Sequence, residues 1–286
     1  MPTLSIIMNC HNCSKYLSKA LESVYQQTFK DYEIIFWDNK STDTSAEIAL
    51  SYGEPLKYFK GEEFLPLGTA RNLAINKARG KYIAFLDCDD MWLPEKLEMQ
   101  CKLLDSNEDL GLVYSDSYMV DYDGNCRKNT CFEVLKPYRG SVLKELLLNN
   151  FIPLLTVVIR KQVLDEVGLF NPRYEIVEEY DLWLKIAELY SIDFTDRPLA
   201  KYRVHDKSST KRNITLLYPE ILQIIDYWVE KKPELKKEFR REIRQRKNII
   251  YREMILSAIM HIYRSKNMES LRDCGNLAKN LIFSRR

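Results

Sequence analysis

Short apolar runs alternate with amphipathic segments over roughly the first ninety residues, and this alternation constrains the fold more than any other feature of the chain. Leu17, Ala20, Leu21 and Val24, for example, recur at the spacing of one helix face. The predicted strands here are residues 4–8, 33–37, 56–59 and 82–86, and the predicted helices lie around 17–24, 44–50 and 69–78. Repeated β-α-β units of this kind favour an α/β fold with a mostly parallel sheet and helices on both faces.

The middle of the chain changes character, and the end is helical. A hairpin turn is predicted at 121–125, because Asp123-Gly124 is a strong turn signal. Further strands are predicted at 112–115 and 151–159, with helices at 141–148, at 161–167 (closed by Gly168) and from Glu178 onward. After about residue 212 the alternation stops, and the pattern predicts helix to the end.

The length, net charge and cysteine content limit the kinds of function that this chain can have. A length of 286 residues suits one large domain, or one domain plus an extension. The net charge of +2 is too small to indicate nucleic-acid binding. Seven cysteines and an N-terminus that leads directly into a strand, with no signal peptide, favour a reducing cytoplasm. Cys10-His11-Asn12-Cys13 is the only C-x-x-C, and no second pair has zinc-site spacing, so no metal is expected there.

Three carboxylates crowd into the turn that follows the strand at 82–86, in Asp87-Cys88-Asp89-Asp90. Like charges at a strand end are costly unless a cation or a set of donors compensates them. Mg²⁺ takes oxygen ligands and usually binds one or two carboxylates together with substrate phosphates. The alternative is a solvated acidic turn in which an Asp caps the next helix.

Polar residues also follow two other strands of the predicted sheet. They occupy positions 9–12 after the first strand and 38–39 after the second, as the acidic turn follows the fourth. In open α/β sheets, ligands bind outside the carboxyl ends of the strands. These three segments are therefore expected to meet in one crevice.

A series of motifs in this order resembles the family 2 glycosyltransferases. The residues that carry the resemblance are Ser5-Ile6-Ile7 with Asn12, Asp38-Asn39 with Ser41-Thr42-Asp43, Gly68-Thr69-Ala70-Arg71-Asn72, 80–90, Gly168-Leu169-Phe170, 178–184 and Tyr202-Arg203-Val204-His205. The resemblance covers roughly residues 3–210. It implies a GT-A (Rossmann-like) fold, with a mixed, mostly parallel sheet flanked by helices, and an inverting transfer of a sugar from a nucleoside diphosphate.

This sequence departs from the usual family pattern at three places. Met8 stands where the family usually has Pro, and Cys10-His11 stands near the usual Thr-Tyr. Glu178-Glu179 stands where the family usually has Glu-Asp.

The resemblance assigns metal and donor contacts. It implies that Asp89 binds Mn²⁺ or Mg²⁺ and that His205 adds a metal or phosphate contact, with a structural histidine as the alternative. Asp87 would reach the ribose or share the metal. Asp90 is either an outer support or a helix cap.

Two further residues bear on the nucleotide. Asp38 can accept the N3–H of uracil, which favours UDP, with the N1–H of guanine as the alternative. Arg71 can neutralise phosphate or contact the base, with a plain surface arginine as the alternative. Asn12 and Cys88 complete the predicted nucleotide-sugar-binding set, Cys88 as a small spacer. Trp92 and Trp183 either line a sugar site or pack in the core, with packing favoured for Trp183.

The acceptor hydroxyl must lose a proton as it attacks, and a carboxylate within reach would act as general base. The family resemblance maps this role to Glu179. Because Glu replaces Asp there, Asp181 is the second candidate. The alternative for both is ordinary acidic charge at a helix start.

Residues 1–212 are expected to form the transferase domain, with a nucleotide-sugar-binding half at 1–115 and an acceptor-binding half at 116–212. Residues 213–286 form a basic helical extension with sixteen Lys/Arg against nine Asp/Glu. The extension is expected to pack on the catalytic domain, to lie on an anionic membrane surface or to mediate a homodimer; no nucleic-acid motif accompanies it.

The predicted protein is a cytoplasmic glycosyltransferase, with a peripheral place on the inner face of the membrane as an alternative. Its acceptor would be a glycan or a lipid-linked glycan in surface polysaccharide synthesis. Two other functions stay open: a non-catalytic nucleotide-sugar-binding module and a sugar nucleotidyltransferase. The latter would be expected to carry a Gly-rich basic loop after the first strand, and residues 9–13 contain no glycine.

Overall fold

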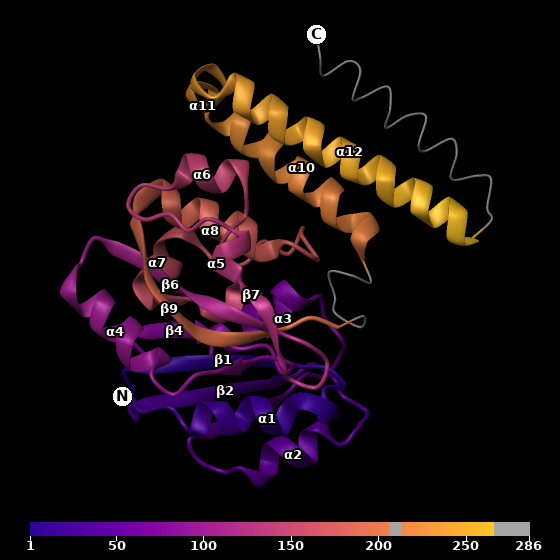
Figure 1. Cartoon of the computed structure of the whole chain (residues 1–286). Helices are drawn as coiled ribbons and strands as arrows, with labels where there is room; N and C mark the ends of the chain where they lie inside the picture. Colours follow the sequence, from indigo (N-terminus) through magenta and orange to yellow (C-terminus); the bar gives the residue numbers. More distant parts are fainter. Residues whose placement is uncertain (206–212, 266–286) are drawn as a thin grey trace. The chain divides into compact units, whose positions relative to one another are not determined.

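The computed structural model describes residues 1–205 and 213–265, with side chains at all of these except 214 and 258–265 (Figure 1). Contacts within the chain divide it into two units. Among the described residues, the first unit comprises 1–143 and 151–205, and the second comprises 144–150 and 213–265.

One nine-stranded sheet forms the centre of the first unit, in the order β3-β2-β1-β4-β8-β6-β9-β5, with β7 paired to β6. Strands β3, β2, β1 and β4 run parallel, whereas β8 is antiparallel to both of its neighbours. The strands are β1 (Leu4–Cys10), β2 (Tyr32–Asp38), β3 (Leu56–Lys60), β4 (Tyr82–Phe85), β5 (Met91–Trp92), β6 (Leu110–Val120), β7 (Cys126–Thr130), β8 (Val158–Arg160) and β9 (Ser191–Arg203). The predicted α/β fold with a mixed, mostly parallel sheet is confirmed.

Helices cover both faces of the parallel half, so its central strands are buried on both sides. Helices α1 (Ser14–Tyr25) and α2 (Ser45–Ser51) lie on one face, and α3 (Leu67–Ile75) lies on the other (Figure 1). The apolar stripe predicted from the sequence, including Leu17 and Leu21, shares one core with Ile6 and Met8 of β1. The remaining helices of this unit are α4 (Lys96–Ser106), α5 (Cys131–Val134), α7 (Lys161–Val167) and α8 (Glu178–Leu189).

Gly80 follows the third helix and is required by its packing against β1. Helix α3 ends at Ile75, and not near residue 78. A Cβ on Gly80 would lie 2.5 Å from the backbone nitrogen of Ser5, so only glycine allows this close approach to β1.

The predicted strand over 151–159 is wrong for most of its length. A 3₁₀ turn occupies Leu154–Thr156, and only the end of the segment forms β8. Side chains take the carbonyls that a strand would use: Trp92 Nε1 donates to Leu155 O at 2.8 Å, and Gln100 Nε2 donates to Thr156 O at 2.7 Å. The apolar composition reflects burial and not extended structure.

Lys96 begins α4 and is fully buried. Its Nζ donates to Gln100 Oε1 at 2.7 Å and lies 4.3 Å from the centre of the Trp92 ring. Burial lowers the pKa of Lys96 to about 7. The folded state therefore releases this proton far more readily than an exposed lysine does.

Replacement of Lys96 by methionine should remove a pH dependence of stability. In the unfolded chain Lys96 keeps its proton up to about pH 10. Between that value and about 7 the unfolded state binds more protons, so the wild-type stability gains from rising pH. We expect the free energy of urea unfolding of wild type, relative to Lys96→Met, to rise by about 2 kcal/mol from pH 7 to pH 9. Lys102→Met, exposed on the same helix, is the control; a pH-independent difference for Lys96→Met would contradict the account.

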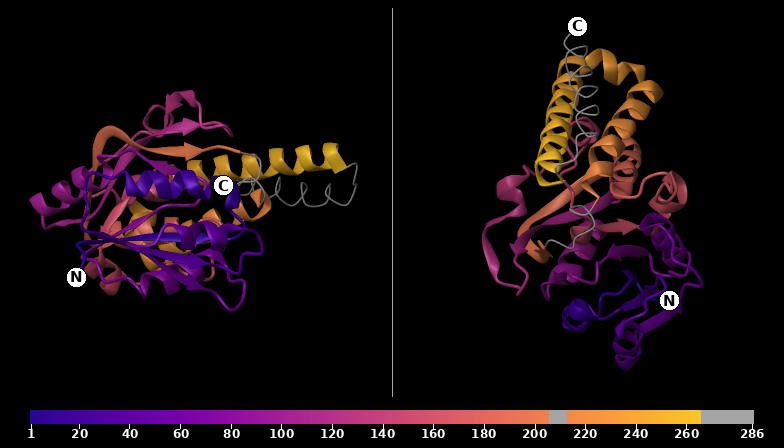
Figure 2. Two further views of the ribbon diagram at one scale, coloured as in Figure 1. Left: turned by 90° about the horizontal axis from the view of Figure 1, so that it is seen from below. Right: turned by 90° about the vertical axis from the view of Figure 1, so that its right-hand side faces the viewer.

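The second unit is helical, as predicted for the described residues. It contains α10 (Ile214–Lys231), α11 (Pro233–Glu238), α12 (Arg240–Ser265) and most of α6 (Leu143–Leu148). Figure 2 shows α10 and α12 as two long helices side by side, and an ion pair between Lys247 and Asp226 joins them. In the part of the chain that the structure describes, no helix is both long and apolar enough to cross a bilayer.

Candidate active site

The carboxyl ends of β1, β2 and β4 lie side by side, as the sequence predicted. Cys10 pairs with Asp38 at the ends of β1 and β2. The backbone nitrogen of Leu86, just after β4, donates to Ile7 O at 3.0 Å. The polar segments 9–12, 38–39 and 87–90 therefore lie at the carboxyl ends of three adjacent parallel strands, where ligands of such sheets bind.

Arg71 joins the acidic turn to the start of α8. Its guanidinium donates to Asp87 Oδ1 at 2.8 Å and to the carboxylate of Glu178. The side chains of Arg71 and Glu178 are 5% and 2% exposed, whereas Asp87 is 38% exposed. Burial opposes the charge on Arg71, but the carboxylates of Asp87 and Glu178 outweigh it and raise the pKa of Arg71. Arg71 is thus a buried bridge between two acidic motifs and not a surface arginine.

Asp89 and His205 form the second contact of the acidic turn. His205 Nε2 lies 2.8 Å from Asp89 Oδ2. Burial and then the charge of Asp87 raise the pKa of Asp89, although the hydrogen bond with His205 opposes the shift. The described residues therefore compensate the negative charge of the turn only in part.

Asp90 holds the acidic turn against β9 and is not a helix cap. Its side chain is buried, and Oδ1 accepts the backbone N–H of Arg203 at 2.7 Å. The cap of α4 lies at Glu95 instead. Burial, followed by the charges of Asp89 and Asp87, holds the pKa of Asp90 well above its ordinary value.

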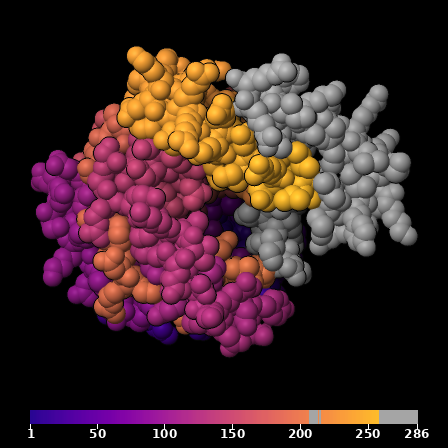
Figure 3. Space-filling view, turned by 45° about the horizontal axis from the view of Figure 1, so that its top comes forward, coloured from indigo at the N-terminus to yellow at the C-terminus, as the bar shows by residue number. Residues whose placement is uncertain are grey.

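Arg203 is a site residue that the sequence reasoning missed. Its buried guanidinium donates from Nε to Asp89 O at 2.8 Å, and from Nη1 to Asp121 O at 3.0 Å and Tyr122 O at 2.9 Å. Arg203, which lies two residues before His205, therefore connects the acidic turn with the β6–β7 hairpin. The β6–β7 region (magenta) and β9 (orange) lie next to each other on the surface in Figure 3. The Tyr-Arg-x-His motif contained this residue, but only its histidine was assigned a role.

The three acids at the start of α8 have different surroundings. Glu178 is paired with Arg71, and Asp181 is buried with Lys185 Nζ 2.7 Å from its Oδ2. Glu179 is half-buried, and its charge contributes to the raised pKa of Arg71. Glu179 is thus the most accessible of the three and lies near the Arg71 bridge.

The side chains after β1 and β2 mainly hold the local backbone. Asn12 has a φ of 55°, and its Oδ1 accepts the backbone N–H of Thr42 at 2.8 Å. Asp38 is fully buried; it accepts the backbone N–H of Ser41 at 2.7 Å and the hydroxyl of Tyr58 at 2.6 Å. Asp38 therefore exposes no carboxylate oxygen to which a uracil could bind in this conformation.

Several other side chains that were predicted to contact the ligand are buried in the core instead. Cys88 is 2% exposed, and its thiol donates to Asn9 O at 3.2 Å. Trp92 and Trp183 are both buried and donate to backbone carbonyls, so the sugar-site alternative for them is wrong. Asn9 is 8% exposed, and the nitrogen and oxygen of its side-chain amide are buried with no hydrogen-bond partner among the described residues.

Comparison with known proteins agrees with this geometry. The model of the family "Glycosyl transferase family 2" matches residues 5–168. The chain belongs to this family. An uncharacterized glycosyltransferase of Methanocaldococcus jannaschii is 33% identical over 217 residues, which are 73% of each chain. The UDP-Glc:alpha-D-GlcNAc-diphosphoundecaprenol beta-1,3-glucosyltransferase WfgD of Escherichia coli is 30% identical over 208 residues, 72% of this chain and 78% of that one.

Solved structures show that this family 2 transferase has the GT-A fold. The mannosyltransferase PcManGT of Pyrobaculum calidifontis, in complex with GDP-Man and Mn²⁺, superposes with a TM-score of 0.66 at 14% identity and covers 98% of this chain and 81% of that one. S. aureus TarS 1-349 in complex with UDP-GlcNAc gives a TM-score of 0.60 at 16% identity, over 97% and 92%.

Proposed function

We propose that this family 2 glycosyltransferase moves a sugar, with inversion and with the help of a divalent cation, from a UDP-sugar to a hydroxyl of a lipid-linked glycan. The observation that carries the proposal is the joined set of groups at the carboxyl edge of the sheet. Arg71 ties the acidic turn to the start of α8, and Asp89 meets His205 at 2.8 Å.

The donor set fits Mn²⁺ or Mg²⁺. Asp89 and His205 offer one oxygen and one nitrogen ligand, and the raised pKa of Asp89 marks charge that a cation would compensate. The protein supplies two ligands here, which suits a cation that takes its other ligands from a diphosphate and water. When bound, the cation would act as a Lewis acid on the leaving diphosphate. Asp87, more than a third exposed, would contact the ribose or share the cation through water.

Glu179 is the proposed general base. It would take the proton of the acceptor hydroxyl while that oxygen forms a bond to the anomeric carbon. The bond between that carbon and the diphosphate breaks on the opposite face, and UDP leaves with the electron pair. Glu178 and Asp181 are less suited, because each is buried against a cation of the protein.

UDP as the carrier is supported by the E. coli relative, whose name includes UDP-Glc. The same name includes a diphosphoundecaprenol-linked acceptor, which supports a lipid-linked acceptor for this chain. A cytoplasmic location with a peripheral place at the membrane would bring the enzyme to such an acceptor. The basic helices of the second unit are proposed to contact that surface or a second copy of the chain.

The role first proposed for Asp38 changes: it shapes the nucleotide site by holding Tyr58 and Ser41.

Replacement of Asp89 by asparagine should remove the gain in UDP affinity that Mn²⁺ gives. We expect calorimetric titration in Mn²⁺ to show UDP binding weakened at least about tenfold, with little change in the absence of metal. GDP in the same titration tests the choice of carrier. Asp165→Asn, an exposed change on α7, is the matched control; an Asp89→Asn variant with the wild-type Mn²⁺ effect would exclude Asp89 as a ligand.

Two other functions make different predictions. A non-catalytic binding module would bind UDP tightly without turning over any donor. A nucleotidyltransferase would form a nucleotide-sugar from a nucleoside triphosphate, which the family match disfavours.

A further inference from the structure

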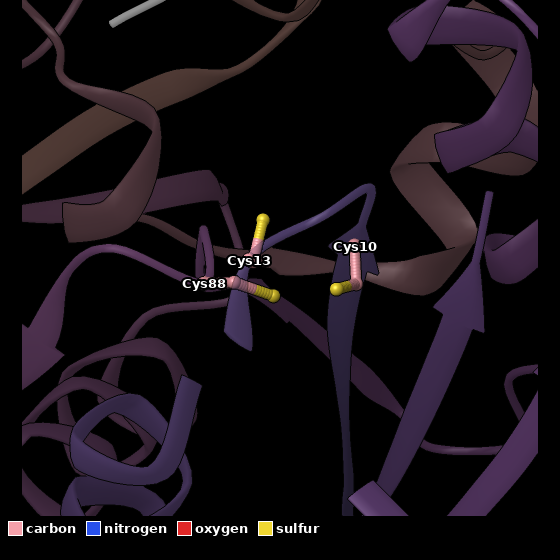
Figure 4. Close-up of side chains that lie close together, drawn as sticks. All are labelled: Cys10, Cys13 and Cys88. Carbon is pink, nitrogen blue, oxygen red and sulfur yellow. The ribbon is translucent and has the colours of Figure 1, made fainter. Parts of the chain in front are cut away.

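Three cysteine thiols gather beside the acidic turn and take no part in the proposed transfer. Cys10 ends β1, Cys13 immediately precedes α1, and Cys88 lies within the turn. Their sulfur atoms all lie within 4.8 Å of one another, and Figure 4 shows the sulfurs of Cys10 and Cys88 pointing toward each other. Among the described residues this is the only group of three such ligand atoms that converges in this way.

The surroundings of this thiol cluster (Cys10, Cys13 and Cys88) suit metal binding better than simple packing. Cys10 and Cys88 are 1% and 2% exposed, whereas Cys13 is half-buried, so a cation can reach the cluster from one side. The backbone of Cys13 is held in place, because its N–H donates to Ser45 Oγ at 2.9 Å.

The spacing is close to that of a zinc site. Zn–S bonds of about 2.3 Å in tetrahedral geometry place the sulfurs about 3.8 Å apart, so closing the site takes shifts of about 1 Å or less. Three thiolates select soft or borderline cations over Mg²⁺ and Mn²⁺. Three protein ligands with an open fourth position also match a zinc site that keeps water.

We propose that Cys10, Cys13 and Cys88 bind one thiophilic cation of the Zn²⁺ class, at a site separate from Asp89 and His205. Each thiol that coordinates releases its proton, and no electron is transferred. Because Cys88 lies between Asp87 and Asp89, an occupied site would fix the backbone that carries the two donor-binding carboxylates. The C-x-x-C motif alone lacked a third ligand, which the pairing of β1 with β4 brings from far along the chain.

The test uses the full chain, freed of metal by a chelator and kept reduced by a phosphine. Titration with Cd²⁺ should give a thiolate-to-metal absorption band that saturates at one cation per chain, and Zn²⁺ should abolish this band by competition. Cys13→Ser, the mildest change because Cys13 is half-buried, should weaken Zn²⁺ binding at least about tenfold. Cys88→Ser should do the same, with circular dichroism to confirm its fold.

Two matched variants separate this site from others. Cys126→Ser changes an exposed cysteine on β7 and should leave the band unchanged. Asp89→Asn should also leave it unchanged, so a failure of the proposed transferase mechanism would not affect this result. The proposal is overturned if wild type gives no thiolate band, if the band survives in Cys13→Ser at full intensity, or if Cys126→Ser removes it.

Discussion

Glu179→Gln should lower the rate of sugar transfer by about 10²- to 10⁴-fold and leave UDP affinity within about twofold of wild type. Glutamine keeps the size of the side chain at the start of α8 but cannot accept the proton of the acceptor hydroxyl. Because glutamine fills the same half-buried position, the packed acids beside it should keep their places. Steady-state rates of UDP release, together with calorimetric UDP binding, measure both quantities.

The matched comparison is Asp181→Asn on the same helix. Asp181 is buried against Lys185, so its replacement should reduce stability more than it reduces the rate per folded molecule. Full turnover by Glu179→Gln, with loss of turnover in a folded Asp181→Asn variant, would reassign the base to Asp181.

Arg71→Met should destabilise the protein by about 3–5 kcal/mol, the usual cost of removing one partner of a buried ion pair. The methionine fills much of the same volume but leaves the buried carboxylate of Glu178 without the guanidinium that compensates its charge. Urea unfolding at neutral pH measures the effect.

Two variants control this experiment. Arg79→Met removes a 59% exposed arginine that pairs with Glu33, and it should cost less than about 1 kcal/mol. Adding Glu178→Met to Arg71→Met should recover most of the lost stability, because an apolar pair then replaces the ion pair. A small cost for Arg71→Met, or no recovery in the double variant, would show that the bridge does not hold the site together.

Local patterns were enough to predict the parallel half of the fold. The apolar runs that became β1, β2, β3 and β4 are short, and the helix between β1 and β2 carries a clear apolar stripe that includes Leu17 and Leu21. The polar ends of these strands meet because adjacent parallel strands end at the same edge. Helix α7 was predicted with its observed bounds, since Gly168 ends it with a φ of 87°.

Features that depend on contacts distant in sequence were not predicted. β9 (Ser191–Arg203) has charged residues and Pro198 within it, and it becomes a strand because it pairs along β6. Arg203 gains its role from carbonyls on two other segments, at Asp89 and Asp121. The ion pair between Arg71 and Glu178 likewise joins residues about a hundred positions apart.

Transfer itself is the most direct test of the central claim. Purified protein would be given UDP-sugars and a diphosphoundecaprenol-linked sugar acceptor, with Mn²⁺ or with a chelator, and scored for UDP release and product. We predict turnover with at least one UDP-sugar that requires both the acceptor and the divalent cation. Tight UDP binding with no cation-dependent turnover for any donor would contradict the account and indicate a binding module.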